Sequence, residues 1–200
     1  SLEQYINDMK DNQKSIYYIT AEDHQSAKAN PLLEGYNARE IEVIILTDPI
    51  DSFWTATNIK YRDKELKHVS QGTEELADIT ITKKKKKKDS KDKINDSDLK
   101  KLVAEIKRVL GDHVSEVKTN SSLIDSPVCI SISDGGYDKT MQKILQERQG
   151  TALSKPVLQI NPNHSVITKL SNMFKNKKIK DIDTTQAVLL MPQIPSELVQ

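Results

Sequence analysis

SLEQYINDMKDNQKSIYYIT, residues 1–20, joins an amphipathic helix to a buried strand, and this pairing decides the fold of the first part of the chain. Its apolar residues recur at spacings of three and four, which predicts one buried helical face; they are Leu2, Tyr5, Ile6 and Met9. Ser1 stands at the N-cap position, with Gln4 three residues later. The continuous apolar run at 16–19 is typical of a strand covered on both faces. The stretch has no initiator Met and no leader, so we expect it to open a piece of a longer protein.

A second apolar run, EVIILT at residues 42–47, predicts another buried strand. Two such strands separated by a helix predict a parallel pair with a right-handed crossover. The further expected elements are a helix over 21–33 that Pro31 and Gly35 end, a helix over 50–59 and a short closing strand over 66–69. The order is then α-β-α-β-α, and residues 1–75 are predicted to form a small α/β unit.

Composition changes after this unit. Residues 76–96 contain few large apolar side chains and include six consecutive lysines at 83–88, so we interpret them as a polar linker. The whole chain is 36% hydrophobic and 4% aromatic, which is lean for one large core. Two small domains joined by a linker fit this composition.

The second unit, residues 97–200, is predicted to be α+β, with helices around a three-stranded sheet. Its first helix, capped by Asp96 or Ser97 and ended by Gly111, carries an apolar stripe of helical period; the stripe is Leu99, Leu102, Val103, Ile106 and Leu110. The predicted strands lie at 113–119, 128–133 and 157–160. We expect the first two of these strands to pair with each other. Further helices are expected over 139–149, after residues 161–163 with Val166, Ile167, Leu170 and Phe174 on the apolar face, and over 184–191.

The charge balance gives no support to some broad classes of function. Lys plus Arg number 30 and Asp plus Glu number 29, a formal net charge of +1, which gives no global reason to expect nucleic acid or an acidic membrane as partner. No window approaches 18 consecutive apolar residues, so we expect no membrane span. The single cysteine, Cys129, excludes an internal disulfide and suits a reducing compartment, so the cytoplasm is the expected location.

The residue pattern predicts no catalytic and no metal-binding residues. The four histidines are scattered without the spacing of metal ligands; they are His24, His68, His113 and His164. Cys129 lies in the middle of a predicted strand, where a small core residue is favoured over a reactive thiol. Asp48 and Asp51 follow a buried strand, where α/β proteins place ligands, so they could bind a cation or do acid–base work. The simpler and favoured interpretation is that Asp51 caps the next helix.

Two surface features also have two interpretations each. The lysine run at 83–88 could hold phosphates, but it has no interleaved aromatic residues and adjacent acids offset its charge, which favours a solvated linker. Met141, Ile144 and Leu145 form a short apolar stripe that either faces the core or makes an adaptable outward patch. The pattern alone favours the core.

Several short motifs resemble those of one family. SLEQY at 1–5, MK at 9–10, Gln13, IYYIT at 16–20 and DPID at 48–51 are similar to the late middle domain of the heat shock protein 90 family of chaperones. LIDSP at 123–127 and LQINPNH at 158–164 resemble motifs of the family's C-terminal dimerisation domain. The matches follow the family's order on both sides of the linker. The short linker resembles that of the bacterial branch, high-temperature protein G.

The resemblance implies an intact protein that is an ATP-dependent chaperone, acting on unfolded or partly folded clients under stress as a cytoplasmic homodimer. In the family, the pocket for ATP and Mg and a catalytic Arg lie upstream of the matched part, so we expect no cofactor and no ATPase activity from this chain alone. In bacterial members, the helix after the Asp-x-x-Asp turn and an amphipathic helix of the C-terminal domain contact clients. The positions implied here are Ser52, Phe53, Trp54 and Ala56, and Met141, Ile144 and Leu145. This favours the outward interpretation of the second set.

The resemblance also implies where the chain dimerises. The family's dimer is sealed by two C-terminal helices; residues 184–191 resemble the first, which implies Val188, Leu189 and Leu190 as dimerisation residues. Pro192 and Pro195 interrupt this helix, and the chain stops at Gln200, so we expect weakened dimerisation. Two alternatives remain open at this point. One is a nucleic-acid-binding protein that uses the lysine run, and the other is a small α/β enzyme with Asp48 and Asp51 in a cleft.

Overall fold

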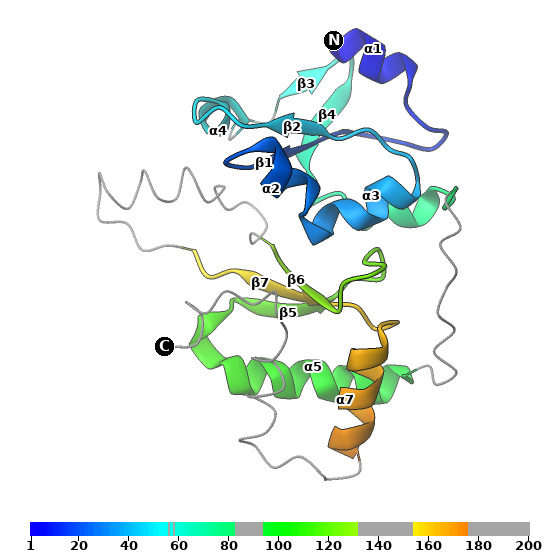
Figure 1. Cartoon of the computed structure of the whole chain (residues 1–200), viewed down its shortest axis with the longest axis vertical. Coiled ribbons are helices and arrows are strands. Elements are labelled where there is room, and N and C mark those ends of the chain that lie inside the picture. The colour runs from blue at the N-terminus through cyan, green and yellow to red at the C-terminus, as the bar shows by residue number, and fades with distance from the viewer. Residues whose placement is uncertain (56, 58, 83–93, 132–153, 176–200) are drawn as a thin grey trace. The chain divides into compact units, whose positions relative to one another are not determined.

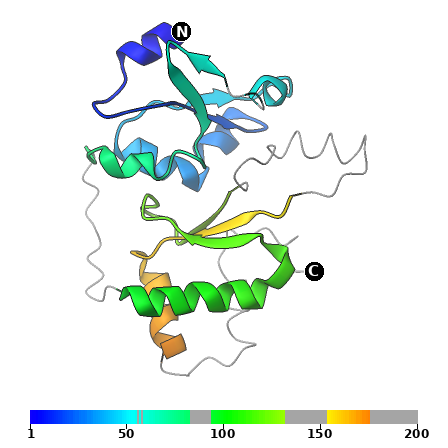
Figure 2. The same ribbon diagram turned by 180° about the vertical axis from the view of Figure 1, so that it is seen from behind.

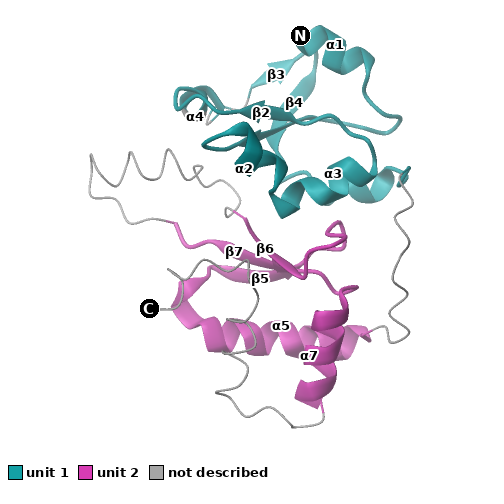
Figure 3. Cartoon of the chain, viewed as in Figure 1, with its two compact units in different colours: residues 1–87, 134–153 teal, residues 88–133, 154–200 magenta. Residues whose placement is uncertain are grey.

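The computed structural model describes residues 1–55, 57, 59–82, 94–131 and 154–175 (Figure 1). These residues fall into two compact units, teal and magenta in Figure 3. The described part of the first unit is 1–82 without residues 56 and 58, and that of the second is 94–131 with 154–175. No helix within these ranges is long and apolar enough to cross a membrane.

The first unit is an α/β fold around a four-stranded sheet of order β2-β1-β4-β3. β1 is parallel to both β2 and β4, and β3 is antiparallel to β4. The elements are α1 (Leu2–Asn7), β1 (Ile16–Thr20), α2 (His24–Lys28), a 3₁₀ helix (Pro31–Leu33), α3 (Glu34–Ala38), β2 (Ile44–Leu46), α4 (Asp51–Thr55), β3 (Lys60–Tyr61), β4 (Lys64–His68) and a second 3₁₀ helix (Glu75–Asp78). The predicted parallel pair is confirmed, within a larger sheet.

β1 is the centre of this unit's core. Ile16, Tyr17 and Ile19 are fully buried, and the run is covered on both faces as predicted. The Ser1 cap is also confirmed, because its Oγ accepts a hydrogen bond from the Gln4 N–H at 3.3 Å. The opening twenty residues therefore fold as their pattern predicts.

The single helix expected over 21–33 is wrong. The chain instead makes two short helices with a 3₁₀ turn between them, because Asn30 and Pro31 start a new turn rather than end the old one. Asn30 Oδ1 accepts from the Leu32 N–H at 2.9 Å, which fixes this restart. α3 then ends beyond Gly35, where Glu40 takes a positive φ of 54° and the Ile41 N–H donates to the Tyr36 carbonyl.

Two strands differ from their predicted roles. β2 is half-buried, not covered on both faces, because it lies at the edge of the sheet. β4, expected as a short closing strand, pairs with β1 inside the sheet and with β3 in a hairpin. That hairpin turns through Arg62 and Asp63, both at positive φ, without the Asn-Gly pair that usually signals such a turn.

Residues 76–82 pack onto the first unit. Leu76 and Ile79 are buried, although the predicted linker begins at 76. The buried Arg39 side chain donates from Nε to the Ile79 carbonyl at 2.9 Å, and the Thr82 N–H donates to the Ala38 carbonyl at 3.1 Å. These bonds hold the segment against α3. The lysine run at 83–88 lies outside the described residues.

A polar cluster on the first unit is centred on the carboxylate of Glu75. It accepts from Lys67 Nζ at 2.6 Å, the Tyr17 hydroxyl at 2.7 Å and Ser15 Oγ at 3.0 Å. Burial by itself would raise the pKa of Glu75, but these three hydrogen bonds outweigh it and hold that pKa below the ordinary value. Burial and the neighbouring carboxylate raise the pKa of the Tyr17 hydroxyl, which therefore stays protonated and donates.

This cluster predicts a pH-dependent contribution to stability. A carboxyl group whose pKa is lower in the folded than in the unfolded state adds stability at pH values above its unfolded-state pKa. This added stability is lost as pH falls through the folded-state pKa. Glu75→Gln is therefore expected to cost about 1 kcal/mol at pH 7, with the difference from the unchanged chain shrinking below about pH 4. Urea unfolding at pH 7 and pH 3 measures this. Glu74→Gln, on the exposed neighbouring residue, is the control; an equal loss for Glu75→Gln at both pH values would contradict the prediction.

The second unit is α+β, with a three-stranded sheet of order β5-β7-β6. Its elements are α5 (Asp96–Leu110), a 3₁₀ helix (Gly111–His113), β5 (Glu116–Thr119), β6 (Val128–Ser131), β7 (Val157–Ile160) and α7 (Ser165–Lys175). The expected pairing of β5 with β6 is wrong, because β7 lies between them, parallel to β5 and antiparallel to β6. The alternating pattern predicted a half-buried strand correctly for β5 but not for β6, which is buried at three of its four residues, and it identified the partner of neither. β7 is buried along its whole length and takes the centre.

The core of this unit lies between the sheet and its helices. Figures 1 and 2 show α5 and α7 together on one face of the sheet. The buried cluster is Leu102, Ile106, Val114, Val117, Val128, Leu158, Ile160, Ile167 and Leu170. The α5 stripe and its Gly111 end are confirmed, whereas the cap is Asn95, whose Oδ1 accepts from the Asp98 N–H at 2.8 Å. On α7, Val166 is exposed, contrary to its predicted place on the apolar face.

The other sheet face carries buried polar groups. Gln159 donates from Nε2 to Ser131 Oγ at 2.8 Å and accepts from Asn120 Nδ2 at 2.6 Å, which links all three strands or their ends. Cys129 is buried beside this row, as predicted for a core residue. These side chains satisfy one another, so the row stabilises the sheet without an external ligand.

Candidate functional site

Two large apolar side chains are exposed around α4 of the first unit. Ile50 is 65% exposed and Phe53 is 50% exposed, and we call these two residues the α4 patch. Trp54 is half-buried, and its indole N–H donates to Asp51 Oδ1 at 2.8 Å. The hydrogen bond fixes Trp54 against its own helix, so Phe53 is the aromatic residue that presents its ring to solvent.

The turn before α4 fixes the patch in place. Asp48 Oδ1 accepts from the Ile50 N–H at 3.0 Å, and Asp51 Oδ2 accepts from the Asp48 N–H at 3.3 Å. The Asp51 N–H donates to the Asp48 carbonyl at 2.9 Å, which closes the turn. Pro49 adds a fixed φ between these anchors. Ile50 is therefore held at the surface by backbone geometry and not by packing.

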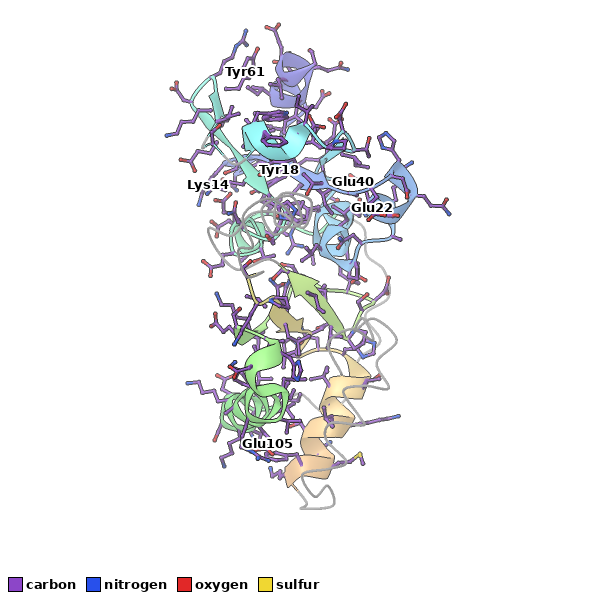
Figure 4. All side chains as sticks on the ribbon, turned by 90° about the vertical axis from the view of Figure 1, so that its left-hand side faces the viewer. Lys14, Tyr18, Glu22, Glu40, Tyr61 and Glu105 are labelled. Carbon is purple, nitrogen blue, oxygen red and sulfur yellow. The ribbon has the colours of Figure 1, made fainter. Side chains whose placement is uncertain are left out.

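The far end of α4 is tied to the sheet. The Thr55 hydroxyl donates to the Asp51 carbonyl at 2.7 Å, and the Tyr18 hydroxyl donates to the Thr55 carbonyl at 3.5 Å. Tyr18 comes from β1, and its side chain lies within the first unit in Figure 4. One long hydrogen bond thus links the end of the helix to the central strand.

This arrangement does not make a catalytic pair of Asp48 and Asp51. Both carboxylates accept hydrogen bonds from donors in their own turn and helix. The predicted cap at Asp51 is wrong, because Asp51 is the first residue of α4 and accepts from the Asp48 N–H and the Trp54 indole, whereas Asp48 Oδ1 accepts the Ile50 N–H at the start of the helix. Within the ranges that the structure describes, no three His, Cys, Asp or Glu side chains gather as metal ligands. The turn therefore serves local structure rather than acid–base chemistry.

The two C-terminal motifs meet in the second unit. The side-chain amide of Asn161, 1% exposed, donates to the Leu123 carbonyl at 3.0 Å and to the Ser126 carbonyl at 3.1 Å. The Asn161 N–H donates to the Pro127 carbonyl at 2.8 Å. His164 then caps α7, since its Nδ1 accepts from the Val166 N–H at 3.2 Å. LIDSP and LQINPNH thus form one bonded corner of the fold.

The sequence model described as Hsp90 protein matches residues 1–194 of the chain, which includes both units and all of these motifs. The chain belongs to the Hsp90 family.

Individual relatives within the Hsp90 family are also similar over most of the chain. Each of three is described as chaperone protein HtpG. That of Orientia tsutsugamushi is 36% identical over 201 residues, covering 96% of this chain and 32% of the relative. That of Nitrobacter hamburgensis is 37% identical, covering 94% and 29%, and that of Ehrlichia canis is 39% identical, covering 88% and 28%. The chain therefore spans about a third of the length of these curated relatives.

Only some of the client-contact residues that the Hsp90 resemblance implied lie among the described residues. Phe53 and Trp54 lie on α4, and the structure separates them into an exposed and a half-buried side chain. Ile50, which the sequence reading did not single out, is more exposed than either; its place after Asp-Pro in a turn was the available signal. Met141, Ile144 and Leu145, and the dimerisation residues Val188, Leu189 and Leu190, lie outside the described residues.

Proposed function

We propose that this chain is the client-contact and dimerisation part of an ATP-dependent chaperone that binds unfolded or partly folded proteins under stress. Membership of the Hsp90 family supports this, as does the description of the similar relatives as chaperones. In the proposed whole protein, ATP and Mg are bound by residues outside this chain, and the protein acts as a cytoplasmic homodimer through Val188, Leu189 and Leu190.

The observation that carries the client-contact role is the α4 patch. Ile50, in the turn before α4, and Phe53, on α4, expose apolar surface, and hydrogen bonds close both the turn and the helix. Burying the exposed half of one such side chain is worth about 1 kcal/mol, since full burial of a large apolar side chain is worth roughly 1.5–3 kcal/mol. The contact is therefore weak and independent of the client's sequence, which suits a surface that must also release its client.

Phe53→Ser tests this proposal. Suppression of the aggregation of heat-denatured citrate synthase, followed by light scattering, is expected to need about five times more of the variant than of the unchanged chain, because roughly 1 kcal/mol of contact is lost. Val166→Ser, a similarly exposed apolar residue on α7, is the matched control and should leave suppression unchanged. Equal suppression by Phe53→Ser and the control would remove the α4 patch from the client surface. Met141→Ser with Leu145→Ser tests the second proposed set in the same assay.

A further inference from the structure

The outer edge of β2 carries backbone groups that are not paired by the part of the chain that the structure describes. β2 ends the sheet, so only its inner side pairs, with β1. The Leu46 carbonyl accepts from the Ala21 N–H at 3.0 Å, so Leu46 and, two residues earlier, Ile44 face β1. The N–H and carbonyl of Ile45 between them therefore point away from the sheet. Along the chain, β2 is followed by the turn that enters α4, so its end leads toward the α4 patch.

β2 has one of the usual protections against added strands, since it is only three residues long. Edge strands are also commonly blunted by lysine, proline or a bulge. Residues 43–46 are instead four consecutive apolar side chains, Val43, Ile44, Ile45 and Leu46, and each is half-buried rather than covered. An extended chain laid beside β2 would gain backbone hydrogen bonds and apolar contacts at once.

Either a second copy of this chain or a separate extended segment could pair with β2, and the charges beside the strand distinguish the two. A second copy pairing antiparallel about Ile45 would put Glu42 opposite Asp48 of the other copy, and the reverse at the other end. Both residues are exposed, and like charges directly opposite one another destabilise a strand pair. The same two carboxylates attract a strand with Lys or Arg at its ends. Self-pairing is disfavoured, and a basic-flanked apolar segment is favoured.

We propose that β2 is a docking strand for an extended polypeptide segment whose apolar residues are flanked by Lys or Arg, joined through the backbone of Ile45. The inference rests on the proposed client-contact function and names its mode of recognition. Unfolded proteins supply such segments, whereas a folded partner keeps its own strands paired. In strand addition the main-chain hydrogen bonds give the affinity, so the exact side chains between the basic residues contribute less to it.

Synthetic peptides test this with the full chain. The probe is acetyl-Lys-Val-Thr-Val-Thr-Val-Lys-amide, and its counterpart carries N-methyl groups on the five central residues, which removes the donors and keeps the side chains. The N-methylated peptide is expected to bind about fivefold more weakly, because the hydrogen bond from a peptide N–H to the Ile45 carbonyl is lost. A peptide with Glu in place of both Lys should also bind more weakly. Hydrogen exchange of the Ile45 amide, followed by NMR, should slow at least tenfold with the first peptide.

Protein variants provide the matched comparison. Ile45→Pro removes the outward N–H, a position where an edge strand tolerates proline, while Ile45→Val keeps it. We expect at least tenfold weaker probe binding for the first and less than twofold change for the second. Trp54 fluorescence shows whether Ile45→Pro disturbs the fold. If it does, the comparison of the two peptides and the hydrogen exchange of the Ile45 amide test the proposal without this variant.

Three results would overturn the proposal. Equal binding of the methylated and unmethylated peptides would show contact through side chains alone. Probe binding that leaves Ile45 exchange unchanged would place the contact elsewhere, and the effect of Phe53→Ser on client aggregation would still stand by itself. A peptide-free dimer that Ile45→Pro dissociates would assign the edge to a second copy.

Discussion

Gly72→Ala is expected to destabilise the first unit by about 3 kcal/mol, the upper range for inserting a group into a packed core. An added Cβ would overlap the Tyr17 ring and the Tyr36 hydroxyl oxygen, and it would lie 2.9 Å from Tyr17 Cδ1. Both rings are fully buried and packed edge to face, with centroids 4.8 Å apart. Neither can shift easily, because Tyr17 donates to Glu75 at 2.7 Å and Tyr36 donates to the Val69 carbonyl at 2.8 Å.

Urea unfolding followed by Trp54 fluorescence measures this effect, since the single Trp of the chain lies in the first unit. Gly111→Ala is the informative control. Nothing lies within 4 Å of its Cβ position, but its φ of 52° strains any other residue, so a loss of about 1 kcal/mol confined to the second unit is expected. Surface substitutions usually change the free energy of unfolding by no more than about 0.5 kcal/mol. If Gly72→Ala changed the value from the Trp54 transition by no more than this, the steric account would be refuted.

Asn161→Asp is expected to cost the second unit about 3 kcal/mol. The substitution keeps the volume of the side chain but replaces the amide NH₂, which donates to the Leu123 and Ser126 carbonyls, by an oxygen that can only accept. Two buried carbonyls then lose their partner, at about 1–3 kcal/mol each before relaxation, and a charge is buried beside them. The loop that leads into β6 should loosen first.

Helical circular dichroism during urea unfolding measures this loss, since α5 and α7 are the longest helices of the described residues. Asn172→Asp makes the same chemical change at an exposed position of α7 and should move the transition by less than about 0.5 kcal/mol. If both substitutions shifted the transition equally, the Asn161 hydrogen bonds would not be the cause.

Local patterns predicted those parts of the fold that neighbours in sequence decide. The burial of β1, the Ser1 cap and the α5 stripe with Gly111 all depend on residues a few positions apart. Strand order depends on distant segments instead. The sequences of β5 and β6 both alternate, but only β5 is half-buried, and the partner of both is β7, which follows much later in the chain.

The candidate site shows the same division. The family motif located α4 and its turn, but sequence could not say whether Phe53 or Trp54 faces solvent. That choice depends on one hydrogen bond, from the Trp54 indole to Asp51, and adjacent helical positions are about 100° apart, so fixing one ring turns the other outward. Ile50 was missed because its exposure is imposed by the turn at Asp48, not by any apolar periodicity.

The burial of Cys129 allows its reactivity to report how often the second unit opens. It is the only cysteine of the chain, it is 3% exposed on β6, and a thiol reagent can reach its sulfur only when that sheet opens. The rate at which the thiol reacts therefore reports the opening frequency of this unit in the native state, without denaturant. Comparing that rate between Gly72→Ala and the unchanged chain would show directly whether loosening one unit is felt by the other.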